Sequence, residues 1–125
     1  MSYTTKLLLP PTYLPASSGL WPNGASNIFS MSNFTLDTLC IIKHIHVCNV
    51  TGDVCHFTLA IDDDSNGAQE GDELFCNQEV LSNNTFDWYG DLLMNTSVLL
   101  GVWAVCAEGD SNLTIMLEGE QGLMF

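Results

Sequence analysis

Residues 39–61 read LCIIKHIHVCNVTGDVCHFTLAI. The first half of this stretch is rich in β-branched side chains, which favour strands over helices. In the second half, Phe57, Leu59 and Ile61 alternate with smaller side chains, which is the period of a half-buried strand. The Thr-Gly-Asp segment at 51–53 between them is typical of a tight turn. The stretch therefore predicts two strands joined as a hairpin.

The same alternation of short strands and turns continues to the end of the chain. Turn-forming residues interrupt the apolar segments about every 8–12 residues. The longest apolar run, residues 98–107, reads as a buried strand, and residues 113–118 alternate as a closing strand. The sequence shows neither extended helical periodicity nor an internal repeat. It predicts an all-β domain over residues 31–125, a single antiparallel β-sandwich or small barrel of jelly-roll-like form.

Residues 1–30 differ in composition and carry all four prolines. Proline lacks a backbone N–H and is excluded from helix interiors and central strands. The segment also holds many large apolar side chains, which disordered tails rarely carry. We predict an extended N-terminal arm, ordered by lying on its own domain, on a neighbouring copy or on another protein. Its expected partner contacts are Leu7, Leu8, Leu9, Tyr13, Leu14 and Trp21.

The charge of the chain is one-sided. Fifteen acidic residues stand against two lysines, Lys6 and Lys43, for a formal net charge of −13. Nucleic acids and anionic membrane surfaces are bound through Lys and Arg, so we expect neither as a partner. A basic protein partner or bound cations would suit this charge. The alternative is that the acidity only keeps the surface soluble.

The remaining composition predicts a protein that is partly covered by partners. Hydrophobic residues make up 46% of the chain and charged residues only 14%, against a usual charged share of about 25%. Apolar surface left on a small domain marks interfaces, and copies of one chain usually close into a symmetric oligomer. Neither a signal peptide nor a membrane-spanning apolar run is visible. We expect a soluble homo-oligomer made in a cytoplasm.

Cysteine and histidine gather in one part of the sequence. His44, His46 and Cys48 alternate onto one face of a strand, and zinc prefers such ligands. The paired-cysteine spacing of zinc sites is missing, however, and ligands two residues apart on one strand crowd a tetrahedron. With an odd number of cysteines we expect reduced, buried thiols and exposed or interface imidazoles rather than zinc. The residues concerned are Cys40, His44, His46, Cys48, Cys55 and His56.

Residues 62–73 read DDDSNGAQEGDE and match the calcium-loop pattern D-x-[DN]-x-[DN]-G-x5-E at every fixed position. The oxygen ligands would be Asp62, Asp64, Asn66 and Glu73, and Gly67 would allow the sharp turn. The preceding residues are strand-like, whereas a calcium loop of this type lies between helices. Asp, Asn, Ser and Gly are also ordinary turn residues. We expect a solvated acidic loop, with calcium binding as the alternative.

Signals of catalysis are weak. The chain has neither a G-x-S-x-G nucleophile motif nor a phosphate-binding glycine loop with lysine. Acidic pairs such as Asp87 with Asp91, and Glu118 with Glu120, have the residue types of glycosidases, but surface carboxylates are the ordinary case. We therefore expect no enzymatic activity, and no cofactor apart from the calcium alternative.

Six short motifs carry a resemblance to a known family. They are IKHIH at 42–46, NVTG at 49–52, FTLAI at 57–61, DWYG at 87–90, LTI at 113–115 and EGE at 118–120. Together they make residues 39–120 resemble small β-sandwich virion proteins of tailed bacteriophages. The resemblance covers about two-thirds of the chain and leaves the proline-rich arm outside it.

This resemblance implies a function. Members of the family look like capsid cement or decoration proteins that bind and stabilise the head shell, or like tail components. The expectation is therefore a structural virion protein made in a bacterial host, with the major capsid protein or other virion proteins as partners. A homotrimer is the first expectation for the oligomer. The alternative is a tail or tail-fibre accessory protein that binds host surface glycan.

Overall fold

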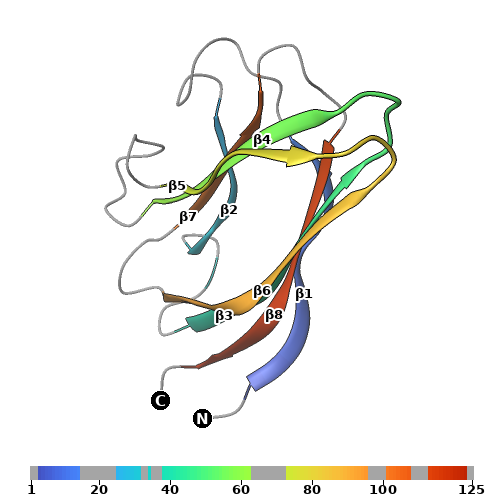
Figure 1. Cartoon of the computed structure of the whole chain (residues 1–125). Helices are drawn as coiled ribbons and strands as arrows, with labels where there is room; N and C mark the ends of the chain where they lie inside the picture. Colours follow the sequence, from blue (N-terminus) through green and yellow to red (C-terminus); the bar gives the residue numbers. More distant parts are fainter. Residues whose placement is uncertain are drawn as a thin grey trace.

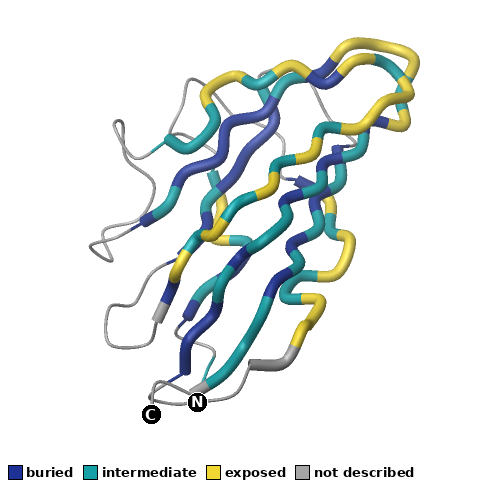
Figure 2. Tube along the Cα trace, turned by 60° about the horizontal axis from the view of Figure 1, so that its bottom comes forward, coloured by how far each residue is buried: buried dark blue, intermediate teal, exposed yellow. Residues whose placement is uncertain are grey.

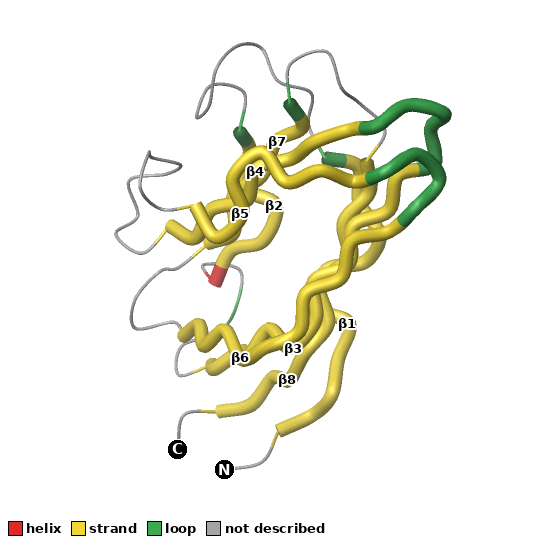
Figure 3. Tube along the Cα trace, in the orientation of Figure 1, coloured by secondary structure: helices red, strands yellow, loops and turns green. Residues whose placement is uncertain are grey.

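The computed structural model describes residues 3–14, 25–31, 34, 38–62, 73–95, 101–107 and 113–123. These residues form β-strands joined by turns (Figures 1 and 3). In chain order the strands are β1 (Tyr3–Tyr13), β2 (Ser26–Ser30), β3 (Thr38–Asn49), β4 (Cys55–Asp62), β5 (Glu73–Val80), β6 (Thr85–Asn95), β7 (Gly101–Cys106) and β8 (Leu113–Leu123). Within the described residues, no helix is long and apolar enough to cross a membrane.

The strands form two four-stranded antiparallel sheets (Figure 1). The first sheet has the order β1-β8-β3-β6, and the second has the order β2-β7-β4-β5. Strands from the two halves of the chain pair in mirrored order: β1 with β8, β2 with β7, β3 with β6 and β4 with β5. This is a long hairpin rolled into a double sheet, the jelly-roll arrangement. It confirms the predicted all-β sandwich.

The core lies between the two sheets and is filled by apolar side chains from both. The most buried strands are β4 and β7 of the second sheet, which agrees with the buried strand expected from the long apolar run. Figure 2 shows buried residues along the middle of the sandwich and exposed ones along its margins and turns. Burying one large apolar side chain stabilises the fold by about 1.5–3 kcal/mol. The largest buried side chains include Phe57, Met31, Ile42, Ile45, Leu59 and Met94.

The predicted hairpin at residues 49–53 is wrong in one respect. The strands on either side of it, β3 and β4, belong to different sheets, so the turn is a corner between layers. It lies beside the connection from β5 to β6, residues 81–84, which crosses between the sheets in the opposite direction (Figure 3). The backbone N–H of Asn83 donates a hydrogen bond to the Thr51 carbonyl oxygen (3.2 Å), and the Ser82 hydroxyl donates to the same oxygen (3.0 Å).

Asn49 holds this double corner together. Its side chain is fully buried, and its Nδ2 donates to the carbonyls of Asp53 (2.8 Å) and Val80 (3.0 Å). Its Oδ1 accepts from the backbone N–H and the hydroxyl of Thr51 (2.9 and 2.7 Å). A buried amide is tolerated only when its donors and acceptors are satisfied. Asn49 meets this requirement by bonding both connections.

The N-terminal segment is part of the sandwich. We expected residues 1–30 to be an arm outside the domain, but β1 pairs with β8 and β2 pairs with β7. Both strands lie at sheet edges, where proline is tolerated because one side of the strand needs no ladder partner. Register shifts between Leu7 and Thr12 accommodate Pro10 and Pro11. An isolated chain of residues 31–125 would lose one edge strand from each sheet.

The expected partner contacts of this segment divide into three groups. Leu14 is only 4% exposed and belongs to the core, and Leu8 and Leu9 pack against that core. Leu14 is therefore a core residue rather than a partner contact, and its backbone N–H donates to the Leu113 carbonyl of β8 (2.9 Å). Leu7 and Tyr13 remain 47% and 69% exposed. Trp21 lies outside the described residues.

The cysteines follow the burial of their strands. All five lie within the described residues, and none forms a disulfide. Cys40, Cys55 and Cys106 are buried, as expected, whereas Cys76 on the edge strand β5 is exposed. Burial raises the pKa of the Cys40 thiol to about 11. Because the thiolate is the reactive form, burial suppresses the chemistry of Cys40 as well as access to it.

We predict that native protein at pH 8 reacts with iodoacetamide first at Cys76. With a pKa of about 11, only about a thousandth of the Cys40 thiol is ionised at that pH, and the side chain is also inaccessible. Peptide mapping by mass spectrometry after timed labelling checks this order. Cys76→Ser should remove the fast phase and leave Cys40 unlabelled until denaturant is added. Early labelling of Cys40 would contradict the described packing.

Candidate functional site

One irregularity in β3 decides which of its side chains face solvent. Between Ile42 and His44, β3 advances by two residues while its partner β8 moves only from Gly119 to Glu118. This β-bulge reverses the alternation of the strand. Ile42 and Ile45 both point into the core, and the two residues between them, Lys43 and His44, are only partly buried.

Gly119 makes the bulge possible. It is buried beside the bulged segment, and a Cβ atom there would collide with the backbone carbonyl of Ile41. The two strands can approach this closely only because glycine has no side chain. The EGE motif thus places Glu118 and Glu120 on either side of a position where the backbones nearly touch.

Four polar side chains meet on the outer face of the first sheet. This histidine cluster consists of His44 and His46 of β3, Asp87 of β6 and Glu118 of β8. His44 Nε2 lies 2.6 Å from Asp87 Oδ1, and His46 Nδ1 lies 2.7 Å from the same oxygen. His44 Nδ1 lies 2.9 Å from Glu118 Oε1. One imidazole is therefore held between two carboxylates on opposite neighbouring strands.

The charges within the cluster shift its titration. Burial disfavours a charged His44, but its hydrogen bonds to Asp87 and Glu118 outweigh this effect and raise the pKa of the imidazole. Hydrogen bonds from His46 and His44 lower the pKa of Asp87. The raised pKa of His44 stabilises the fold below the ordinary histidine pKa, and this contribution is lost as the pH rises through the raised value. The lowered pKa of Asp87 stabilises the fold at higher pH and is lost on acidification.

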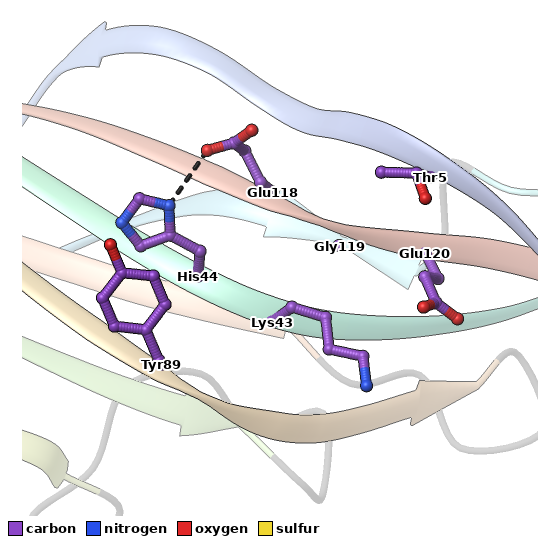
Figure 4. Close-up of a pocket in the computed structure, with 7 residues that line it drawn as sticks. All are labelled: Thr5, Lys43, His44, Tyr89, Glu118, Gly119 and Glu120. Carbon is purple, nitrogen blue, oxygen red and sulfur yellow. Dashed lines mark hydrogen bonds and ion pairs between the residues drawn. The ribbon is translucent and has the colours of Figure 1, made fainter.

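A pocket of about 310 Å³ adjoins the cluster (Figure 4). The Tyr89 ring stacks on the His44 ring, with centroids 4.4 Å apart and planes 8° from parallel, and fixes the imidazole between itself and Glu118. Lys43 forms an ion pair with Asp91 nearby. The pocket therefore combines an exposed aromatic ring with charges of both signs. It is lined by Thr5, Lys43, His44, Tyr89, Glu118, Gly119 and Glu120.

The zinc grouping considered from the sequence is only partly assembled. His44 and His46 lie together, but Cys40 and Cys55 are buried in the core, and His56 lies on β4 of the second sheet, 3.9 Å from Glu79. Asp87 and Glu118 complete the cluster instead. Sequence reasoning missed this set because 41 and 74 residues separate these carboxylates from the histidines that they contact. Only strand register brings them together.

The calcium loop connects neighbouring strands of the second sheet. β4 ends at Asp62 and β5 begins at Glu73, so its flanking elements are strands, as the preceding residues predicted. Asp62 is buried and Glu73 is partly buried. Asp64, Asn66 and Gly67 lie outside the described residues. The solvated acidic loop therefore stays the prediction, with calcium binding as its alternative.

Comparison with known proteins finds likeness in structure alone. No family model matches the chain, and no curated protein matches its sequence. Solved structures of infectious bursal disease virus do match: the Gx strain with a TM-score of 0.51 and the Gt strain with 0.50, each at 9% identity over 96% of this chain. A crystal structure of the T13 particle of the same virus matches with a TM-score of 0.51, also at 9% identity over 96% of this chain.

The fold is a viral capsid-like β-sandwich. The chain spans 32%, 30% and 30% of the lengths of the three matched chains, so the likeness concerns one jelly-roll unit of larger proteins. At 9% identity it shows a shared fold and assigns no role to the histidine cluster. The shared fold is the β-sandwich that the sequence motifs imply.

We predict that Gly119→Ala destabilises the protein by about 1–3 kcal/mol, because overpacking forces the bulged backbones apart. Urea denaturation followed by tryptophan fluorescence measures the change. Gly52→Ala is the matched control, since a Cβ at that turn position meets nothing within 4 Å. Equal stability of the Gly119→Ala and Gly52→Ala proteins would contradict the close approach at the bulge.

Proposed function

We propose that the chain is a non-enzymatic structural protein of a tailed bacteriophage particle, which binds the capsid shell as a cement or decoration protein. The observation that carries the proposal is the jelly-roll topology shared with chains of an icosahedral virus particle. The short motifs that resemble small phage virion proteins support the same assignment. A chain with 15 acidic residues and two lysines suits a basic protein surface better than nucleic acid.

The edge strand β1 is the expected contact to the shell. An edge strand presents unpaired backbone groups along one side, and β1 adds the exposed apolar side chains of Leu7 and Tyr13. Single exposed apolar residues are ordinary, but two on one unpaired edge give a second chain two apolar contacts beside free backbone groups. The proline pair between them keeps copies of β1 from pairing along the full strand.

A second candidate function is glycan binding as a tail accessory protein. The pocket beside the histidine cluster favours it, because Tyr89 is 72% exposed there and carboxylates lie close by. Sugars bind by stacking on aromatic faces and by hydrogen bonds to such polar groups. In the shell-binding proposal the same pocket has no required role.

The test is co-sedimentation of the purified protein with capsid shells and, separately, with tails of the parent virus. We expect binding to shells, and a loss of roughly tenfold or more in affinity for the Leu7→Ser/Tyr13→Ser double variant. Leu93→Ser on the opposite edge strand β6 is the control, because Leu93 is also a large exposed apolar residue. Binding to tails alone would favour the second candidate, and binding to neither would reject a virion role.

We further propose that the isolated protein forms a closed homo-oligomer, with a trimer as the expected state. A chain with 46% hydrophobic and 14% charged residues leaves apolar surface that symmetric association would bury. The choice of a trimer follows the resemblance to phage proteins. Multi-angle light scattering at micromolar concentration measures the mass directly, and a stable monomer would contradict the proposal.

A further inference from the structure

We propose that His44, His46 and Asp87 bind one divalent transition-metal ion of the zinc class on the outer face of the first sheet, with Glu118 orienting His44. This inference concerns a site that the virion role does not require, and it stands independently of that role. The ligand atoms of the three side chains all lie within 4.8 Å of one another. They come from β3 and β6, which are paired strands of one sheet.

The hydrogen-bond geometry around His44 favours a cation at this position. A neutral imidazole carries one N–H, yet both nitrogens of His44 face carboxylate oxygens, Nδ1 at 2.9 Å and Nε2 at 2.6 Å. When Nδ1–H donates to Glu118, the Nε2 lone pair points at Asp87 Oδ1, which is also an acceptor. A proton or a metal ion between these two atoms removes the conflict. His46 Nδ1 contacts the same oxygen, so one ion there meets two nitrogens and one oxygen.

Glu118 completes the pattern of a metal-bound histidine. Metal-ligating histidines usually donate the second ring N–H to a carboxylate, which fixes the tautomer and the ring orientation. The Nδ1–Glu118 contact supplies this partner, and the stacked Tyr89 ring restrains the imidazole from one face. The site is therefore pre-arranged before any ion arrives.

The objection that histidines two residues apart crowd a tetrahedron does not hold for this geometry. The ring centroids of His44 and His46 are 5.8 Å apart, and the ring planes are inclined at 65°. The two residues also present different nitrogens to the ion, Nε2 from His44 and Nδ1 from His46. Ligand atoms on a tetrahedral zinc are about 3.3 Å apart, so the present 2.6–2.7 Å contacts to Asp87 need to open by a fraction of an ångström. The side chains are partly exposed, which permits this movement and lets an ion enter.

The donor set and the charge decide the class of ion. Imidazole nitrogens suit zinc, copper, nickel and iron, whereas calcium and magnesium prefer oxygen ligands alone. With neutral imidazoles the histidine cluster holds two negative charges, and the nearest lysine, Lys43, is already paired with Asp91. Three protein ligands leave one position toward solvent, which water or a side chain of a bound protein can fill.

The test uses full-length, chelator-treated protein at neutral pH, with Zn²⁺ in isothermal titration calorimetry and Co²⁺ in absorption spectroscopy. We expect one equivalent to bind at micromolar concentration or tighter. His44→Ala, His46→Ala and Asp87→Asn should each weaken binding by at least a hundredfold, and Glu118→Gln by about 10–100-fold. His56→Ala is the matched control, because His56 is the remaining histidine of the chain and lies on the other sheet. The Zn²⁺ affinity of the His56→Ala protein should equal that of the wild type.

Two further readouts separate this site from adventitious binding. The Co²⁺ spectrum should lack a thiolate charge-transfer band, because no cysteine is among the proposed ligands. In NMR, the imidazole signals of His44 and His46 should be displaced by Zn²⁺ while those of His56 stay in place, a comparison that needs no variant. Absence of stoichiometric binding, a thiolate band, or equal losses in the His56→Ala and His44→Ala proteins would overturn the proposal.

Discussion

One extra residue in β3 decides which side chains lie on the outer face of the first sheet. Strict alternation would place His44 and His46 on the same side as Cys40 and Ile42, which are fully buried. Two imidazoles between the sheets would lose their hydration without gaining the carboxylates that now contact them, at a cost of several kcal/mol. The bulge opposite Gly119 turns both rings outward while Ile45 and Val47 continue the core. Packing of the core and assembly of the histidine cluster are therefore consequences of the same backbone shift.

The scarcity of positive charge in the chain determines the electrostatics of the histidine cluster. The chain carries a formal charge of −13, and both of its lysines contact acceptors on the first sheet, Lys6 at Gln121 and Lys43 at Asp91. Histidine is then the remaining side-chain type that can become cationic near neutral pH. Two of the three histidines lie on β3, where His44 contacts both Asp87 and Glu118 and His46 contacts Asp87. The two carboxylates that contact His44 favour a positive charge on its imidazole.

Four strands form the edges of the two sheets. β1 and β6 border the first sheet, and β2 and β5 border the second. Prolines and register shifts break the regularity of β1, which limits open-ended strand pairing while leaving apolar side chains exposed.

Local sequence determined the fold class and several of the strands after residue 38, but not β1 and β2, which lie in the segment expected to be an arm. Alternating apolar residues in 57–61 and 113–118, the β-branched run in 39–50 and the turn residues between them each act over a few positions, and the structure confirms strands at all three. Proline likewise determined that residues 3–13 could not form a central strand, and they lie at an edge. These features are readable because side-chain sterics and backbone donors act on immediate neighbours.

Only the tertiary structure decided which strands pair and which side chains meet. The turn at 49–53 has the composition of a hairpin, yet it is a corner because β3 is paired with β6 and β8 instead. The same pairings bring Asp87 and Glu118 to His44, across 43 and 74 residues of sequence. Register and sheet membership follow from burying the inner faces of both sheets against each other at once. A site that depends on them has no local signature, because no short segment contains the contacts that form it.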